Sequence, residues 1–260
     1  MSDAQGRLHV VHFSPSGTTQ AVAHTFAQGT SLETAEHDLL RTPDKGVEFT
    51  PEDAAAFFMP VFAGRIPTCC RMRLEELTAK GNPAVAVVVF GNRAYDDALL
   101  ELRNLLSERG FVVFAAAAFV AQHSIFPTVA QGRPDDEDKH LIASFAQQCF
   151  QKLSSFVQGE VVGQVSVPGK TPYVKPASVP LCPTASAKCT GCLACVKICP
   201  AKAINATNPR KTDKSRCFCC TACIAVCPVK ARAFHTPLYA PIAKAFAAKN
   251  SSRKEGETFI

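Results

Sequence analysis

The sequence contains no apolar run long enough to cross a membrane, no Trp and no Gly-x-Gly-x-x-Gly. The apolar run Phe111–Ala121 has 11 residues, whereas a spanning helix needs about 20, so this run predicts a buried strand. Without the glycine fingerprint, no dinucleotide site of the Rossmann type is indicated. Residues Met1–Gly6 are polar and lack the basic and apolar regions of a signal peptide, so we expect a cytoplasmic protein.

Cysteine, in contrast, is abundant, with thirteen residues in a chain of 260. Most of it falls in two copies of one pattern. The first copy is Cys189-x2-Cys192-x2-Cys195-x3-Cys199-Pro200, and the second is Cys217-x2-Cys220-x2-Cys223-x3-Cys227-Pro228. Closely spaced thiolates wrap a tight loop around one metal centre, and the proline then turns the chain away because it has a fixed φ and no N–H. So many cysteines without a sign of secretion indicate a reducing compartment.

Two metal chemistries compete for these thiolates. Zinc binds four thiolates as well, but its motifs usually pair two cysteines, leave a long gap and pair two more. Complete four-cysteine runs that end in Cys-Pro favour [4Fe–4S] clusters, which exchange single electrons. The remaining cysteines are interpreted as small buried hydrophobic residues; they are Cys69, Cys70, Cys149, Cys182 and Cys219.

Residues 186–236 resemble a bacterial two-cluster ferredoxin module. The resemblance implies that the fourth cysteine of each run ligates the other cluster. One [4Fe–4S] cluster is then held by Cys189, Cys192, Cys195 and Cys227, and the other by Cys217, Cys220, Cys223 and Cys199. Cys219 departs from the motif, since this position more often carries another residue. We interpret it as a spare thiol packed near the cluster, and ligation by Cys219 is the alternative.

The two halves of the chain differ in charge. Residues 1–160 carry 13 Lys+Arg and 19 Asp+Glu, a balance of −6, whereas residues 161–260 carry 15 and 3, a balance of +12. A basic half favours nucleic-acid binding when taken alone. Two anionic clusters, however, remove roughly 4 units of that balance. We therefore expect the lysines to offset the clusters, and no nucleic-acid partner.

Residues 1–160 alternate between apolar runs and helical patterns. Strands are expected at 8–14, 54–59, 84–90 and 111–121, with a weaker edge strand at 33–39. Helices are expected at 18–28, 71–80 and 97–109, and another after Pro134, where Asp135–Asp138 place acids at its positive end. This alternation predicts an α/β fold with an open, doubly wound, mostly parallel sheet.

The loop after the first expected strand, Ser14-Pro15-Ser16-Gly17-Thr18-Thr19, leads directly into a helix. Hydroxyls and exposed N–H groups at a helix N-terminus can cradle a phosphate. The loop has no lysine, so it is not a P-loop for nucleoside triphosphates. Its place at a carboxyl strand end, where α/β sheets bind ligands, suits the phosphate monoester of FMN. Taken alone, the same residues form an ordinary capped turn, and both interpretations stay open.

With two later loops, at 60–67 and 90–97, residues 7–155 resemble flavodoxin. The resemblance implies that Ser14, Ser16, Gly17, Thr18 and Thr19 hold the FMN phosphate. It also implies flavin-ring contacts from Phe62, Ala63 and Gly64 on one side and from Gly91, Asn92, Arg93 and Tyr95 on the other. Tyr95 is the first choice for ring stacking, and a plain surface tyrosine is the alternative. The chain has no Trp, so a tryptophan stacking partner of the flavodoxin kind is missing. Arg65 and Arg93 are either stabilisers of the anionic reduced flavin or surface charges, and His123 has either a redox or a structural role.

The whole chain resembles fused flavodoxin–ferredoxin electron carriers. The expected organisation is a flavodoxin-like FMN domain at 1–158, a linker at 159–180, a small α+β two-cluster ferredoxin domain at 181–237 and a tail at 238–260. We expect an electron-transfer protein of anaerobic metabolism that relays electrons between FMN, two [4Fe–4S] clusters and redox partner proteins. The alternatives are a flavin-dependent reductase fed by the clusters, and a redox-sensing module that uses the basic tail Lys244–Lys254.

Overall fold

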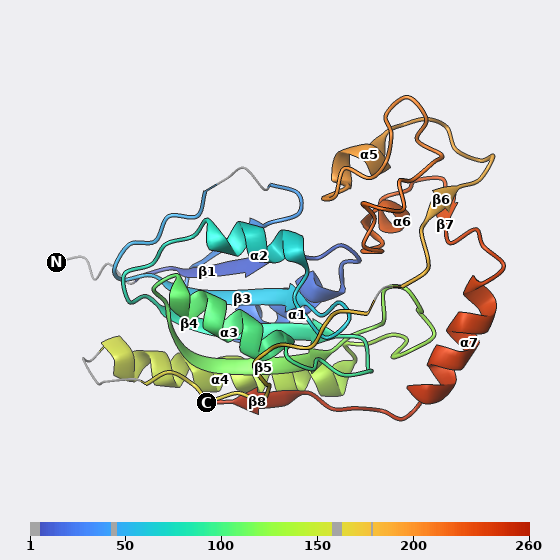
Figure 1. Cartoon of the computed structure of the whole chain (residues 1–260). Helices are drawn as coiled ribbons and strands as arrows, with labels where there is room; N and C mark the ends of the chain where they lie inside the picture. The colour runs from blue at the N-terminus through green and yellow to red at the C-terminus, as the bar shows by residue number, and fades with distance from the viewer. Residues whose placement is uncertain (1–5, 43–45, 158–162, 178) are drawn as a thin grey trace.

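A six-stranded sheet with the strand order β2-β1-β3-β4-β5-β8 forms the core of the larger unit of the protein (Figure 1). The computed structural model describes residues 6–42, 46–157, 163–177 and 179–260. The strands are β1 (Leu8–His12), β2 (Thr34–Asp38), β3 (Ala54–Pro60), β4 (Pro83–Phe90), β5 (Val112–Val120) and β8 (Glu257–Phe259). All of them run parallel except β8, which pairs antiparallel with β5. The predicted doubly wound parallel sheet is therefore confirmed, with one additional edge strand.

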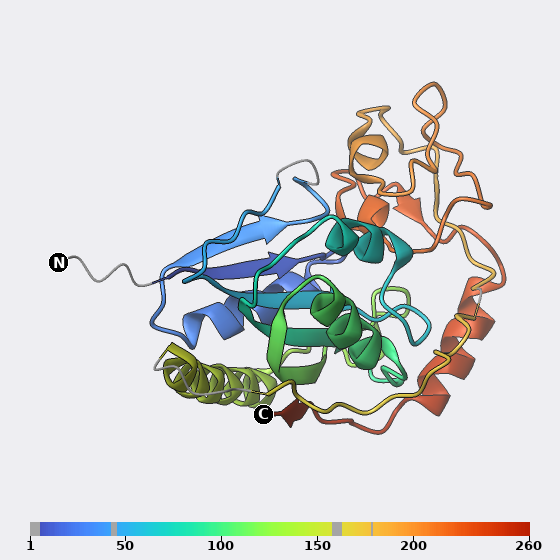
Figure 2. The ribbon, with the colours of Figure 1, turned by 60° about the vertical axis from the view of Figure 1, so that its left-hand side comes forward.

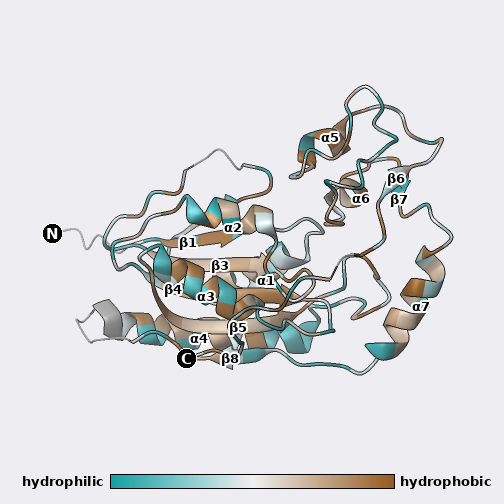
Figure 3. Cartoon of the chain, in the orientation of Figure 1, coloured by the Kyte–Doolittle hydropathy of each residue, from teal (hydrophilic) through white to brown (hydrophobic). Residues whose placement is uncertain are grey.

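Two pairs of helices cover the two faces of the sheet (Figure 2). The pair α1 (Thr18–Gln28) and α4 (Asp136–Val157) packs on one face, and the pair α2 (Thr68–Glu75) and α3 (Ala98–Glu108) packs on the other. Strands β3 and β4 are buried along their whole length, as expected of strands covered on both faces. Figure 3 shows this as apolar colour along the inner strands and polar colour on the outer parts of the helices.

One helix lies earlier in the chain than predicted. The sequence pattern predicts a helix at 71–80, but α2 begins at Thr68 and ends at Glu75. Pro67 precedes it, and the fixed φ of proline suits the start of a helix. Residues after α2 are held by other bonds instead: Ala79 N–H donates to the carbonyl of Arg109 at 2.8 Å, and Gly81 N–H to that of Gly110 at 2.8 Å.

The segment expected to be a linker is docked along α3 in its described part, residues 163–177. Val165 is buried, and its N–H donates to the carbonyl of Val113 in β5 at 2.8 Å. The carboxylate of Asp97 accepts from the backbone N–H groups of Lys170 and Val174 at 2.9 and 2.6 Å. These residues form no helix or strand, but they lie against α3 and β5, because Asp97 and the edge of β5 offer them hydrogen-bond partners.

The segment expected to be a C-terminal tail, 238–260, also returns to the α/β unit. It forms α7 (Tyr239–Lys249) and then strand β8. Phe246 of α7 packs on Phe126, with ring centroids 4.7 Å apart. Arg253 pairs with Asp135 before α4 at 2.6 Å, which anchors the chain between α7 and β8. This correction of the tail follows from apolar residues on α7 and from a free sheet edge on β5.

The cysteine-rich unit is small and lies near the carboxyl ends of the parallel strands (Figures 1 and 2). It contains β6 (Thr184–Ala185) and β7 (Arg232–Ala233), which pair antiparallel, and the short helices α5 (Ala194–Ile198) and α6 (Ala222–Ala225). The predicted small α+β unit is confirmed. None of the helices in the described residues combines the length and apolarity that a membrane span requires. The exact domain boundaries stay predictions.

Candidate functional site

The two cysteine runs fold as near-repeats of each other. Leu193 and Thr221 precede α5 and α6 with φ of 60° and 66°, and Lys202 and Lys230 have φ of 48° and 49°. In both runs the fourth thiol accepts a backbone N–H four residues later: Ala203 N–H donates to Cys199 Sγ at 3.3 Å, and Ala231 N–H to Cys227 Sγ at 3.2 Å. Donors aimed at these sulfurs suit thiolates that carry negative charge.

One cavity brings together four thiols from both runs. Its walls include the side chains of Cys199, Cys217, Cys220 and Cys223. These are the four residues that the crossed-ligation scheme assigns to one cluster, with Cys199 contributed by the other run. The rest of the lining is mostly apolar, including Ile204, Ala222 and Phe218. The donor set fits a [4Fe–4S] cluster held by four thiolates, and its ligand assignment stays a prediction.

The other four predicted ligands include one exposed cysteine, whereas the first set has none. Cys192 is exposed and Cys189 is half-buried in the loop before α5, whereas Cys195 is buried. Burial opposes ionisation of Cys227, yet the N–H groups of residues 229, 231 and 232 and the Arg232 charge lower the pKa of its thiol. This set contains the four donors expected for the second cluster, and it faces solvent more than the first set does.

Arg232 is a buried cation in the midst of the thiols. It is 3% exposed, and its guanidinium donates to the carbonyls of Pro209 and Pro183 at 2.7 and 2.8 Å. Its Nη1 lies 3.8 Å from Cys195 Sγ, and its Nε has no hydrogen-bond partner among the described residues. No carboxylate in the described part of the chain pairs with it. A buried charge needs a counter-ion, and thiolate-bound clusters, which are anionic, fit that need.

Cys219 lies outside the four-thiol cavity. Its buried thiol donates to the carbonyl of Leu181 at 2.5 Å. The neighbouring Cys217 thiol, to which it is hydrogen-bonded, and burial both raise the pKa of Cys219. This geometry supports the interpretation of a spare packed thiol. Cys219 stands in the second run where Gly191 stands in the first, and both residues have a positive φ, 58° and 70°.

The predicted phosphate loop lies at the N-terminus of α1, which begins at Thr18. Ser14 is fully buried, and its hydroxyl accepts the N–H of Gln20 at 2.9 Å, which closes the loop. Ser16 and Thr18 hydroxyls lie 3.0 Å apart. No described group accepts the backbone N–H of Ser16, Gly17, Thr18 or Thr19. A Cβ built on Gly17, at φ 90°, meets no atom within 4 Å, so the space in front of these donors is open. The loop fits a phosphate group.

The loop after β3 makes a tight turn from Phe62 to Arg65. The backbone N–H groups of these two residues donate to each other's carbonyls at 2.8 and 3.2 Å. Ala63 and Gly64 between them have φ of 51° and 83°, the arrangement of a type I′ turn. Phe62 is half-buried, and its ring centroid lies 6.1 Å from that of Phe218 in the second cysteine run. Phe62 therefore joins the predicted flavin loop to the wall of the four-thiol cavity.

The loop after β4 corrects several expectations. Tyr95 is buried rather than available for stacking, and its hydroxyl donates to Glu257 in β8 at 2.7 Å. Burial, and then the Glu257 carboxylate, raise the pKa of Tyr95. The side-chain amide of Asn92 donates to the carbonyls of Asn250 and Ser252, both at 2.9 Å. Both side chains thus hold the C-terminal segment, because that segment passes over this loop.

The remaining residues of these loops have structural partners. Arg65 forms a two-pronged ion pair with buried Glu101, at 2.7 and 2.6 Å, so it faces α3. Arg93 is exposed and pairs with Asp96. Gly91 lies against His123, whose ring atoms would be 2.6–2.8 Å from an added Cβ. His123 Nδ1 accepts the N–H groups of Ile125 and Phe126 at 3.2 and 3.1 Å, which organises the loop after β5.

Two residues of this site were missed at the level of sequence. Phe218 lies between the predicted ligands Cys217 and Cys220. An aromatic residue inside a predicted cluster loop could have indicated a contact surface there. Arg232 follows the second Cys-Pro in a half of the chain with only three acids. That scarcity of acids was the signal that a buried arginine there would need an anionic cofactor as counter-ion.

Comparisons with known proteins found one matching family model and several similar solved structures. Residues 186–205 match the family model of the 4Fe-4S binding domain. Similar solved structures include a flavodoxin from the domain Archaea (16% identity, TM-score 0.45, 57% of this chain and 99% of that one) and a flavodoxin from Bacillus cereus (15%, 0.42, 57% and 99%). A further one is an NAD(P)H:quinone oxidoreductase from Methanothermobacter marburgensis (14%, 0.38, 58% and 98%). No curated protein sequence matches the chain.

These structural similarities are too low to carry an argument about function. The strand order is the stronger observation, because 2-1-3-4-5 is the flavodoxin-like order and its ligand crevice opens between β1 and β3. The chain consequently consists of a flavodoxin-like α/β unit and a cysteine-rich unit that carries a 4Fe-4S binding domain. A redox role follows from these two units.

Proposed function

We propose that this chain is an electron-transfer protein that holds FMN in the flavodoxin-like unit and two [4Fe–4S] clusters in the cysteine-rich unit. When bound, the clusters exchange single electrons and FMN exchanges one or two. The observation that carries the proposal is the contact between Phe62 and Phe218, with ring centroids 6.1 Å apart. One ring belongs to the predicted flavin loop, and the other lines the four-thiol cavity.

The residues around the cofactor sites each have a definable task. The open N–H groups of the Ser14–Thr19 loop bind the phosphate, and Phe62 is the half-buried aromatic that remains for the flavin ring. The N–H groups of Ala203 and Ala231 and the Arg232 guanidinium stabilise negative charge on the thiolates. Apolar residues around the four-thiol cavity exclude water from the cluster predicted there.

The surface of the cysteine-rich unit suggests the chemistry of a redox partner. Its exposed lysines include Lys188, Lys197, Lys202, Lys211, Lys214 and Lys230. Between residues 181 and 254 the only acid is Asp213. Such a basic surface attracts an acidic protein by long-range steering, which weakens as salt rises. The exposed loop of Cys192 lies within this surface, so we propose an acidic partner that docks there.

The experiment is cofactor analysis followed by rapid kinetics, both under anaerobic conditions. We expect about eight irons and eight sulfides per chain, with one FMN. In stopped-flow reduction, flavin reduction should follow cluster reduction at a rate independent of protein concentration, because the two units share one chain. Zinc without labile sulfide, no FMN, or a strictly bimolecular flavin phase would each contradict the proposal. Multiple turnover of a small acceptor without a partner protein would instead support a reductase.

A further inference from the structure

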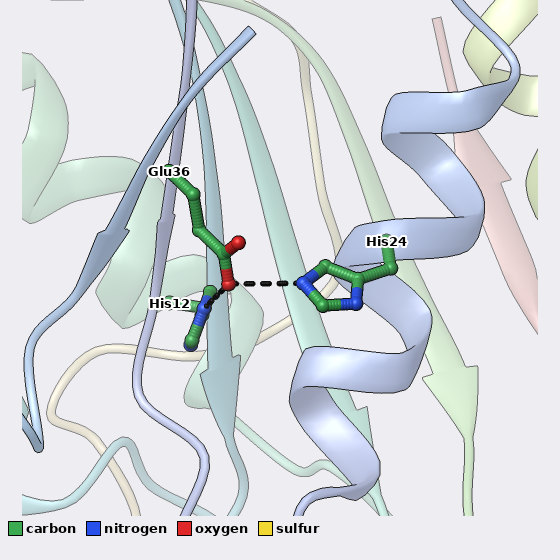
Figure 4. Close-up of side chains that lie close together, drawn as sticks. All are labelled: His12, His24 and Glu36. Atoms are coloured by element: carbon green, nitrogen blue, oxygen red, sulfur yellow. Dashed lines mark hydrogen bonds and ion pairs between the residues drawn. The ribbon is translucent and has the colours of Figure 1, made fainter.

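A second group of potential metal ligands lies far along the chain from the cysteines, at the edge of the flavodoxin-like unit. His12 ends β1, His24 lies on α1 and Glu36 lies on β2 (Figure 4). The parallel register pairs Val10 with Glu36, so the side chains of His12 and Glu36 share the sheet face that α1 covers. His24 points at them from the helix.

The rings of His12 and His24 both point at one carboxylate oxygen of Glu36. Glu36 Oε1 lies 2.7 Å from His12 Nε2 and 2.9 Å from His24 Nε2, and it also accepts the side-chain N–H of Gln20 at 3.0 Å. Glu36 Oε2 takes no hydrogen bond from any described residue.

We propose that His12, His24 and Glu36 bind a divalent first-row metal ion of the zinc class. Two imidazoles and one carboxylate are a recurrent donor set for such ions, which leave a further position to water. The three ligand atoms already lie within 4.8 Å of one another. Metal bonds of about 2.0–2.1 Å place tetrahedral ligand atoms about 3.3 Å apart. The two Glu36–histidine distances, 2.7 and 2.9 Å, would then lengthen by about half an ångström, and the two histidine nitrogens would adjust by no more than about 1.5 Å.

The surroundings define the strength and role of the site. The side chains of His24 and Glu36 are 49% and 45% exposed, so solvent reaches the open position. His12 is fully buried, and its Nδ1 has no partner in the described structure. Without an acceptor to orient that ring nitrogen, we expect an exchangeable site rather than a very tight one. A bound ion would tie the half-exposed edge strand β2 to β1 and α1, two residues from the phosphate loop.

The test is zinc binding to the cluster-loaded protein, so that the eight cysteines predicted as cluster ligands are already occupied. The probe is ZnCl2 in anaerobic equilibrium dialysis, with zinc and iron both measured. We expect one zinc per chain with the iron content unchanged. Zinc K-edge EXAFS should show only N/O neighbours near about 2.0 Å and no sulfur near about 2.3 Å.

Two variants leave the fold intact and remove one ligand each. His24→Ala lies on an exposed helix face, where alanine is a strong helix former, and Glu36→Gln preserves the shape of the side chain. Each should weaken zinc binding by at least about 10–100-fold. His140→Ala, on the exposed face of α4, is the matched control and should bind like the unaltered protein. Absence of binding, sulfur neighbours, or unchanged affinity in both ligand variants would overturn the proposal.

Discussion

The ring of Phe62, in the loop after β3, lies 6.1 Å from the ring of Phe218, which stands between two predicted cluster ligands. The tilt between the rings is 44°, and a centroid distance of this size is normal for a packed aromatic pair. The pair is a direct contact between the flavodoxin-like unit and the cysteine-rich unit, next to the four-thiol cavity.

Replacing Phe218 with leucine should slow electron transfer between the two units without removing a cofactor. The apolar volume is largely kept, but the aromatic contact with Phe62 is lost. Stopped-flow reduction measures the rate, and iron and FMN analysis measures the content. Val226→Ala, at an exposed apolar position of the same unit, is the control. Equal rates in both variants would mean that Phe218 has no part in the coupling.

Replacing Cys199 with serine should remove the cluster predicted in the four-thiol cavity. Cys199 lines that cavity with the thiols of the second run, so iron should fall from about eight to about four per chain. Spectroscopy of Cys199→Ser should show that the cluster of Cys189, Cys192 and Cys195 survives. Loss of that cluster instead would refute crossed ligation. In Cys219→Ser the hydroxyl can still donate a hydrogen bond to the carbonyl of Leu181. This variant should therefore retain both clusters.

Gly17→Ala should weaken FMN binding by about 2–4 kcal/mol, because its Cβ would enter the space expected for the phosphate and cost one or two charge-assisted hydrogen bonds. Gly81→Ala is a matched control. The two glycines have φ of 90° and 88°, and in each case an added Cβ meets no atom within 4 Å. Both variants carry the same backbone strain of about 1–2 kcal/mol, but only Gly17 lies in the phosphate loop. A fluorescence titration with FMN measures the difference, and equal affinities would refute the phosphate site.

Arg232→Gln should lower the reduction potential of the neighbouring clusters. Reduction adds negative charge, which the buried guanidinium 3.8 Å from Cys195 Sγ stabilises. At an effective dielectric constant of about 20, a charge roughly 8 Å from the cluster centre contributes about 2 kcal/mol, on the order of 100 mV for one electron. An anaerobic titration followed by EPR gives the potentials. Arg210→Gln, at an exposed position, should shift them far less. Unchanged potentials in Arg232→Gln would exclude the proposed counter-ion role.

His123 should make stability depend on pH. Burial, and then the charge of Arg93, lower the pKa of His123 to about 4, below the unfolded value of about 6.5. The unfolded chain therefore binds the proton first, and stability falls as pH drops below about 6.5. The loss should reach about 1.4 kcal/mol at pH 5.5. Denaturant unfolding at pH 7.5 and 5.5 measures it. His123→Asn, which can still accept the N–H bonds of that loop, should lack this component. An equal loss in the variant would show that another group titrates.

Local sequence determined much of this molecule. Cysteine spacing predicts two cluster loops, and the first lies within the residues that match the 4Fe-4S binding domain. Apolar runs identified β1, β3, β4 and β5, since strands covered on both faces carry continuous hydrophobic sequence. Gly17 and its neighbouring hydroxyls predict a phosphate loop, because the donors there belong to adjacent residues.

Tertiary structure alone decided which side chains stay available to a ligand. Tyr95 and Asn92 look suited to a flavin in the sequence, but β8 and the segment before it take up both side chains. His12, His24 and Glu36 meet only because two strands and a helix pack together. Phe62 meets Phe218 for the same kind of reason. Such pairings join residues far apart in the chain, and hydrophobic periodicity carries no information about which distant polar group lies opposite.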